Sequence, residues 1–235
     1  MTRFTLDDTI AAISTPAGEG GIGIVRLSGP VVREIAAAIF VPARRGQGMP
    51  PRRLVLGRVV DEAGAPLDEV LLAYMPAPHT YTRQDVVEIN CHGGVVATRR
   101  VLEACLRRGV RSAGPGEFTL RAFLNGRIDL AQAEAVLDAV RARTDAGLQI
   151  AVSQLAGSLS ARVRAVRESL LQAQAHVVAS IDFPEDEIPA LDLPAALRDV
   201  AAGIDRLLAT ADSGIVYRQG VRAAIVGRPN VGKST

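Results

Sequence analysis

Lysine, cysteine and histidine are scarce in this sequence of 235 residues. The few cysteines and histidines bear on the redox compartment and on metal binding. The two cysteines, Cys91 and Cys105, lack CxxC spacing, so we expect two free thiols in a reducing compartment. His79 and His176 have no acidic or cysteine neighbours at metal-ligand spacing, which argues against a zinc site. No apolar run approaches the ~18 residues of a membrane span. The first eight residues lack the basic and apolar segments of a signal peptide. We therefore expect a cytoplasmic protein without membrane contact.

The single lysine, Lys233, stands out because the chain has 27 basic residues and the other 26 are arginines. A net charge of +2 is too small to predict nucleic-acid binding. An ammonium is a compact point charge, whereas a guanidinium is a wide planar fork. A single lysine in a chain so rich in arginine indicates a tight site in which a guanidinium group does not fit.

Residues 1–118 have the pattern of an α+β domain. Two segments, 31–40 and 95–108, have the spacing of helices, and Gly109 follows the second as a usual C-terminal stop. Short runs rich in β-branched residues, bounded by Gly, Pro and Asp, predict strands at 10–14, 22–27, 54–60, 70–74 and 86–91.

Residues 119–216 have a purely helical pattern, which predicts an all-α domain built as a bundle. Apolar residues recur mostly at spacings of three and four between 148 and 181, so we expect one long amphipathic helix over about 145–181. A second apolar stripe runs from 193 to 211. A third helix is expected over 129–143, with Asp129 as its N-cap. We interpret these stripes as core rather than as a partner surface.

The last segment, 217–235, predicts the start of an α/β domain that binds nucleotide. An apolar strand, 221–226, leads into residues 227–234, which fit the phosphate-loop pattern G-x-x-x-x-G-K-S/T at every fixed position. Gly227 and Gly232 allow backbone N–H groups to point at phosphate oxygens. Lys233 then bridges the outer phosphates and the Ser234 hydroxyl ligates Mg²⁺. This pattern leaves ATP and GTP as alternatives. Because the chain ends at Thr235, we expect these residues alone to neither bind nor hydrolyse nucleotide well.

Two other turns are less specific. The glycine-rich segment 15–26 does not fit a dinucleotide fingerprint and is equally consistent with a flexible loop. His92, in the turn Asn90-Cys91-His92-Gly93-Gly94, could contact a ligand, although a lone turn histidine is more often structural. The acidic corner 182–187 is interpreted as solvated rather than as a cation site.

Six segments together resemble the signature segments of the MnmE/TrmE family of tRNA-modification GTPases. They occur in the family's order and span nearly the whole chain: DTIAAISTPAG at 8–18, GGIGIVRLSG at 20–29, DVVEINCHGG at 85–94, GPGEFTLRAFLN at 114–125, DLAQAEA at 129–135 and IDFP at 181–184. The combination of these segments with a phosphate loop near this position makes the resemblance specific.

The resemblance implies a three-part fold: an α+β N-terminal folate-binding and dimerisation domain, an all-α helical domain, and the start of an α/β P-loop (Ras-like) G domain. It also implies that 5-formyl-tetrahydrofolate, or a related tetrahydrofolate, binds at Arg26, Glu88 and Arg127. Arginine suits a carboxylate bidentately and a glutamate suits pterin donors. Many relatives carry lysine at the place of Arg127, so its contact geometry can differ here. On the residues alone, an ordinary surface or inter-strand pair of Arg26 and Glu88 is the less favoured alternative.

For the nucleotide loop, the resemblance implies GTP as the ligand. The GTP-binding residues would be Gly227, Asn230, Val231, Gly232, Lys233, Ser234 and Thr235. Asn230 would help to coordinate K⁺, which supplies the positive charge that other GTPases take from an arginine finger. The catalytic switch regions are not in this sequence. The implied partners are a second copy of the chain, bound through the N-terminal domain, an FAD-dependent MnmG/GidA-type subunit, and tRNA.

Two functions remain open at this point. In the first, GTP hydrolysis drives the closure of paired G domains and so gates addition of a carboxymethylaminomethyl group to the wobble uridine of tRNA. In the second, a folate-binding dimerisation module carries a switch GTPase that acts in the assembly of a partner such as the ribosome. Both use the same residues, and only the first predicts loss of the wobble modification in a deletion strain.

Overall fold

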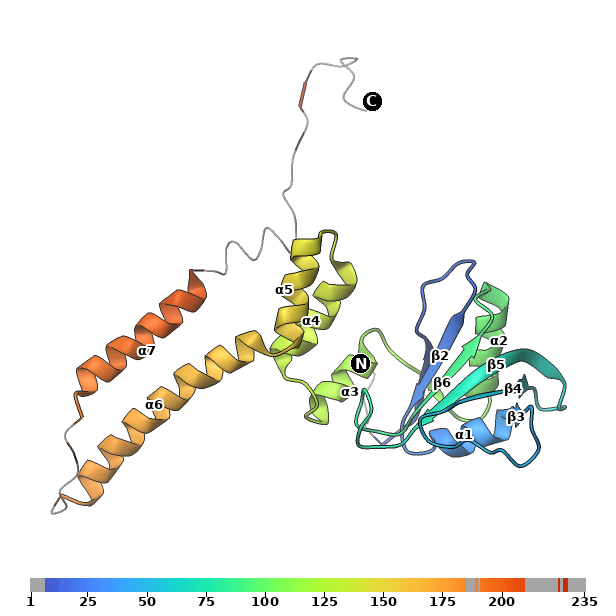
Figure 1. The fold of residues 1–235 in the computed structure, drawn as a ribbon, viewed down its shortest axis with the longest axis horizontal. Coiled ribbons are helices and arrows are strands. Elements are labelled where there is room, and N and C mark those ends of the chain that lie inside the picture. Colours follow the sequence, from blue (N-terminus) through green and yellow to red (C-terminus); the bar gives the residue numbers. More distant parts are fainter. Residues whose placement is uncertain (1–6, 185–188, 190, 210–223, 225, 228–235) are drawn as a thin grey trace. The chain divides into compact units, whose positions relative to one another are not determined.

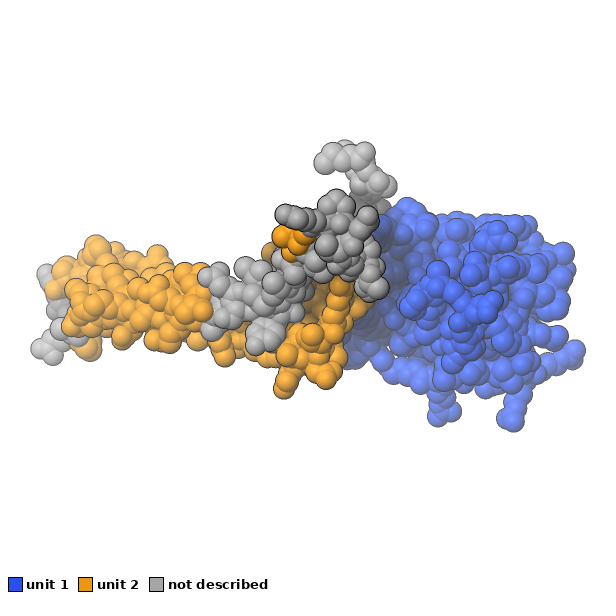
Figure 2. Space-filling view, turned by 90° about the horizontal axis from the view of Figure 1, so that it is seen from above, with its two compact units in different colours: residues 1–128 blue, residues 129–235 orange. Residues whose placement is uncertain are grey.

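The computed structural model describes residues 7–184, 189, 191–209, 224, 226 and 227. The chain forms two compact units, residues 1–128 and residues 129–235, which Figure 2 colours separately. Apart from Gly227, the predicted nucleotide-binding residues lie outside the described part of the chain. Within that part, no helix is both long and apolar enough to cross a lipid bilayer.

The first unit is built on a seven-stranded sheet with the order β3-β4-β5-β6-β2-β1-β7. Neighbouring strands are antiparallel except for β1 and β7, which are parallel. The strands are β1 (Ile10–Ile13), β2 (Gly23–Ser28), β3 (Phe40–Pro42), β4 (Leu54–Val60), β5 (Pro66–Met75), β6 (Val86–Cys91) and β7 (Arg111–Ser112).

One face of this sheet forms the core, because α1 (Val32–Ile39) and α2 (Val95–Leu106) pack against it (Figure 1). Alternate residues of the central strands, such as Val25, Leu27 and Ile89, are fully buried in that core. The residues between them in the sequence therefore lie on the opposite face. This alternation places Arg26 and Glu88 on the face that the two helices leave uncovered.

The α+β prediction for this unit is confirmed, and the five predicted strands and two helices are all present with small shifts at their ends. Sequence reasoning missed two short strands, β3 and β7. It also did not define α3 (Glu117–Leu124), which follows β7 and lies within the first unit.

The second unit contains four helices among its described residues: α4 (Leu130–Arg141), α5 (Asp145–Leu155), α6 (Ser158–Asp182) and α7 (Leu193–Leu208). The helical prediction is confirmed, as is Asp129, whose carboxylate accepts a hydrogen bond from the backbone N–H of Gln132 in a capping box. Figure 1 shows α6 and α7 as an antiparallel hairpin, and Gly203 of α7 lies close to Val166 of α6.

The prediction of a single helix over about 145–181 is wrong. Gly157 adopts a left-handed conformation, with φ of 86°, and separates α5 from α6. The Gln132 side chain stabilises this break because its amide donates a hydrogen bond of 2.8 Å to the carbonyl of Leu155. The predicted apolar stripe is also largely exposed within the described residues: Leu159 and Val163 are 36% and 50% exposed.

Two adjacent glycines before α2, Gly93 and Gly94, differ in how closely other atoms surround them. A Cβ added to Gly93 would overlap the backbone carbonyl of Gly20, whereas a Cβ on Gly94 would meet nothing within 4 Å. Gly93→Ala should therefore destabilise the protein by about 2 kcal/mol or more, since backbone must shift. Gly94→Ala should cost under about 1 kcal/mol, the difference between Gly and Ala at an N-cap.

Urea unfolding of the two variants, read by circular dichroism, measures this difference. Equal stability of Gly93→Ala and Gly94→Ala would mean that the backbone of Gly20 does not lie against Gly93.

Candidate functional site

The candidate site begins with an ion pair on the uncovered face of the sheet. Arg26 of β2 and Glu88 of β6 are directly opposite each other in the antiparallel register. The guanidinium donates from Nε to Glu88 Oε1 at 2.8 Å, and its Nη2 lies 2.7 Å from the same oxygen. Both side chains are about one quarter exposed. The pair therefore presents a fixed positive and a fixed negative group to solvent side by side.

Aromatic rings flank this pair and bring the third predicted residue to it. The Arg26 Cζ atom lies over the rings of Tyr81 and Phe118, at 5.7 and 5.8 Å from their centroids. The Arg127 Cζ atom lies 4.8 Å from the centroid of the same Tyr81 ring. The structure thus brings Arg26 and Arg127 to the ring of Tyr81, and Glu88 joins them through its ion pair with Arg26. We call these four residues and Phe118 the arginine–aromatic cluster.

Hydrogen bonds fix the segment that carries Tyr81 against α3 and the turn after it. The Tyr81 hydroxyl is 2.9 Å from the hydroxyl of Thr119 on α3. Asn125 donates from its side chain to the carbonyl of Thr82 at 2.6 Å, and its own carbonyl accepts from Arg83 at 3.0 Å. Arg83 has a φ of 59°, unusual for a non-glycine residue, and these bonds hold it there.

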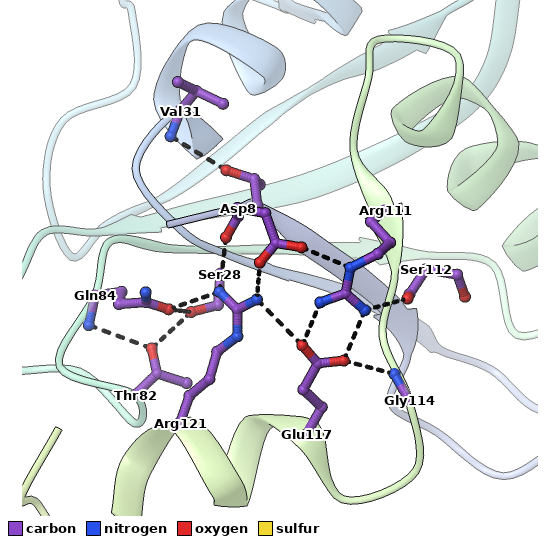
Figure 3. Close-up of polar contacts among 11 residues, drawn as sticks. Asp8, Ser28, Val31, Thr82, Gln84, Arg111, Ser112, Gly114, Glu117 and Arg121 are labelled. Carbon is purple, nitrogen blue, oxygen red and sulfur yellow. Dashed lines mark hydrogen bonds and ion pairs between the residues drawn. The ribbon is translucent and has the colours of Figure 1, made fainter. Parts of the chain in front are cut away.

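Helix α3 itself is anchored by a network of four charged residues, shown in Figure 3: Asp8, Arg111, Glu117 and Arg121. Glu117 lies between the two guanidiniums. It accepts from Arg111 at 2.5 and 3.0 Å and from Arg121 at 3.1 Å. Arg121 also donates to the Asp8 carboxylate and, at 2.7 Å, to the Asp8 carbonyl. The side chains of Glu117 and Arg121 are each only 1% exposed.

Hydrogen bonds within this network lower the pKa values of its two carboxyl groups. Burial would raise the pKa of Glu117 and of Asp8, but hydrogen bonds from Arg111 and Arg121, and from Gly114 to Glu117, outweigh it. The pKa of each carboxyl is consequently below its ordinary value, 4.5 for Glu117 and 3.8 for Asp8. Hydrogen bonds to Glu117 and Asp8 raise the pKa of Arg111. Both carboxyls and Arg111 are therefore charged at neutral pH.

A separate charged pair lies at the turn before α2. The Nδ1 atom of His92 is 2.6 Å from an oxygen of Asp68, and the His92 backbone N–H donates to the other oxygen at 2.8 Å. The Asp68 side chain is 11% exposed, while that of His92 is 70% exposed. The hydrogen bond and charge of Asp68 raise the pKa of His92 above the usual 6.5. This pairing stabilises the turn and leaves the rest of the imidazole ring in solvent.

Both cysteines are buried free thiols. Burial raises the pKa of Cys91, and it raises that of Cys105 to about 12. Neither thiol is therefore ionised at neutral pH, which removes them as nucleophile candidates.

The arginine–aromatic cluster fits a flat, conjugated, partly anionic ligand. Guanidiniums bind carboxylates, a carboxylate accepts from ring N–H donors, and aromatic rings favour flat conjugated groups. Sequence reasoning missed Tyr81 and Phe118. Phe118 lies inside one of the quoted signature segments, whereas Tyr81 lies just before another, in a segment without a recognised motif.

Comparisons with known proteins match both units. The family described as "GTP-binding protein TrmE N-terminus" matches residues 9–127, and the family described as "MnmE helical domain" matches residues 130–228. A protein of Chloroflexus aurantiacus named "tRNA modification GTPase MnmE" is 54% identical over 230 residues, covering 98% of this chain and 51% of that protein. A protein of the same name from Roseiflexus castenholzii is 52% identical over 229 residues, covering 97% and 49%. The chain spans about half the length of these curated relatives.

Replacing one buried carboxylate should reveal how much the charged network contributes to stability. Glu117→Gln leaves two guanidiniums short of a partner charge, so we expect a loss of about 3 kcal/mol in the free energy of unfolding. Glu103→Gln is the matched control, because Glu103 forms only an exposed pair with Arg99 at 3.8 Å. Its loss should be under about 0.5 kcal/mol.

Denaturant unfolding at several pH values tests both size and sign. Because the pKa of Glu117 is lowered on folding, its contribution is present above about pH 4.5 and is lost as pH falls through the folded pKa. The gap between wild type and Glu117→Gln should therefore narrow in acid. A gap that stays constant down to pH 2 would contradict the network's ionised state.

The His92–Asp68 pair predicts a pH effect of the opposite sign. A raised histidine pKa contributes stability below about pH 6.5, which is lost as pH rises through the folded pKa. Asp68→Asn should return the His92 pKa toward 6.5 in an NMR titration, whereas Glu103→Gln should leave it raised. An unchanged His92 pKa in Asp68→Asn would show that the pair does not form in solution.

Proposed function

The chain belongs to the MnmE/TrmE family, and from this premise we propose that the whole protein is a K⁺-activated GTPase that modifies tRNA. Its reaction adds a carboxymethylaminomethyl group at C5 of the wobble uridine, with 5-formyl-tetrahydrofolate as one-carbon donor. The curated relatives that it matches carry the name tRNA modification GTPase. The folate donor, the ions and the partners are parts of the proposal.

The observation that carries the folate assignment is that Arg26 and Arg127 both contact the Tyr81 ring while Glu88 pairs with Arg26. Arg26, Glu88 and Arg127 come from β2, β6 and the turn after α3, far apart in sequence. Glu88 would accept from the N–H donors of the pterin, and the guanidiniums would bind the carboxylates of the glutamyl tail. The bound tetrahydrofolate would supply the one-carbon unit.

We assign the phosphate loop to GTP. Gly227 and Gly232 would bring backbone N–H groups to the phosphates, together with Val231 and Thr235, while Lys233 would bind the outer phosphates. Ser234 would hold Mg²⁺ and Asn230 would help to hold K⁺. The lone lysine of the chain supports this role, because Lys233 is the position where a compact ammonium is required.

The partners follow from the same proposal. Two copies of the chain pair through the N-terminal folate-binding domain, residues 1–118, and the helical domain, 119–216, leads to the G domain that begins at 217. An FAD-dependent MnmG/GidA-type subunit acts with the dimer on tRNA in the cytoplasm. GTP hydrolysis by paired G domains gates the modification.

Nucleoside analysis of tRNA tests this function. A deletion strain should lack the carboxymethylaminomethyl group at the wobble uridine, and the full-length wild-type gene should restore it. Full-length Glu88→Ala and Lys233→Ala should each fail to restore it, because one loses the donor site and the other loses the phosphate grip. Glu69→Ala, which removes an exposed glutamate of the same sheet outside the cluster, should restore it fully.

Normal wobble modification in the deletion strain would overturn the tRNA assignment and favour the assembly-switch alternative. Full restoration by Glu88→Ala would remove that residue from the donor site. Full restoration by Lys233→Ala would remove GTP hydrolysis from the reaction.

A further inference from the structure

Tyr81 joins three residues of the candidate site that are far apart in sequence: Arg26, Arg127 and Thr119. Its ring lies under the guanidiniums of both Arg26 and Arg127, and its hydroxyl is bonded to Thr119 of α3. It is half-buried, so it is neither a core residue nor a free surface side chain.

We propose that Tyr81 is a positioning residue of the folate site, whose ring holds the guanidiniums of Arg26 and Arg127 where both face the same anionic ligand. This inference rests on the proposed folate site and names the side chain that organises it. Two like charges repel, but each guanidinium gains from the electron-rich ring face. The two distances to the ring centroid limit the separation of the Cζ atoms to at most 10.5 Å.

The two arginines depend on the ring to different degrees. Arg26 is also held by Glu88, through bonds of 2.7 and 2.8 Å. Arg127 is exposed, and its guanidinium contacts the Tyr81 ring. Because a free arginine side chain samples many rotamers, removing the ring should displace Arg127 more than Arg26.

The backbone around the ring is fixed independently of the ring itself. The Arg127 N–H donates to the carbonyl of Ala122 at 2.9 Å, and Asn125 and Arg83 join the two segments by reciprocal hydrogen bonds. A variant that lacks the ring therefore keeps the loop in place and loses the contacts to the guanidiniums. The hydroxyl contact to Thr119 orients the ring, and its loss in Tyr81→Phe leaves the ring present.

The test compares Tyr81→Leu with Tyr81→Phe in the full-length protein. Calorimetric titration with 5-formyl-tetrahydrofolate should give an affinity about tenfold weaker for Tyr81→Leu and within about twofold of wild type for Tyr81→Phe. In a double-mutant cycle, Tyr81→Leu should weaken binding much less in an Arg127→Ala background than in wild type, because the ring acts through Arg127. Thermal unfolding of each variant checks that it is folded.

A second measurement needs no ligand. In wild-type protein labelled on arginine, ring currents of Tyr81 should shift the NMR signals of the Arg127 side chain, identified by their absence in Arg127→Lys. Unshifted Arg127 signals would overturn the positioning role even if no folate binds.

The outcomes separate the inference from the function on which it rests. If wild-type protein does not bind folate but its Arg127 signals are shifted, the folate site is wrong. The positioning of Arg127 by the Tyr81 ring then still holds. Folate binding that is equal in wild type and Tyr81→Leu overturns the inference alone. Equal losses in Tyr81→Phe and Tyr81→Leu, or effects that simply add in the double variant, also overturn it.

Discussion

The buried ion pair between Glu117 and Arg121 is the interaction on which the geometry of the first unit depends. Both side chains are 1% exposed, so neither charge can be left without a partner except at a large free-energy cost. Arg121 also reaches Asp8 near the N-terminus, and Glu117 reaches Arg111 on β7 (Figure 3). Helix α3 cannot shift on the sheet without breaking this set of bonds together.

The buried Glu117–Arg121 pair also helps to position the arginine–aromatic cluster, because it fixes α3. Phe118 directly follows Glu117, and Thr119, which bonds to Tyr81, comes next. Once the buried pair fixes α3, the ring of Phe118 and the hydroxyl of Thr119 have defined places. The sheet fixes the other side, because the register of β2 and β6 sets Arg26 opposite Glu88. A binding site assembled in this way loses little side-chain entropy when a ligand arrives.

The sequence predicted the parts of this arrangement that depend on local pattern. Strands 54–60 and 86–91 match β4 and β6 to the residue, because each is a β-rich run with an aspartate at one boundary, Asp61 after the first and Asp85 before the second. The break at Gly157 was missed, because the apolar spacing continues across it with almost the same phase. Strands β3 and β7 were missed because three and two residues show no period. Tyr81 was missed because its importance comes from contacts with Arg26, Thr119 and Arg127, which no local window contains. The assignment of Arg26, Glu88 and Arg127 came from family resemblance rather than from pattern.

The charged network around α3 shows one physical reason for the excess of arginine over lysine. Arg111 donates to Asp8, to both oxygens of Glu117 and to the carbonyl of Ser112, which requires a planar group with donors pointing in several directions. An ammonium is a compact point charge and could not span these acceptors. Arginine is thus the required base at position 111, for reasons of shape as much as of charge. The proposed GTP site has the opposite requirement, a compact cation among crowded phosphates, and the lone lysine stands at the position that the phosphate-loop pattern reserves for it.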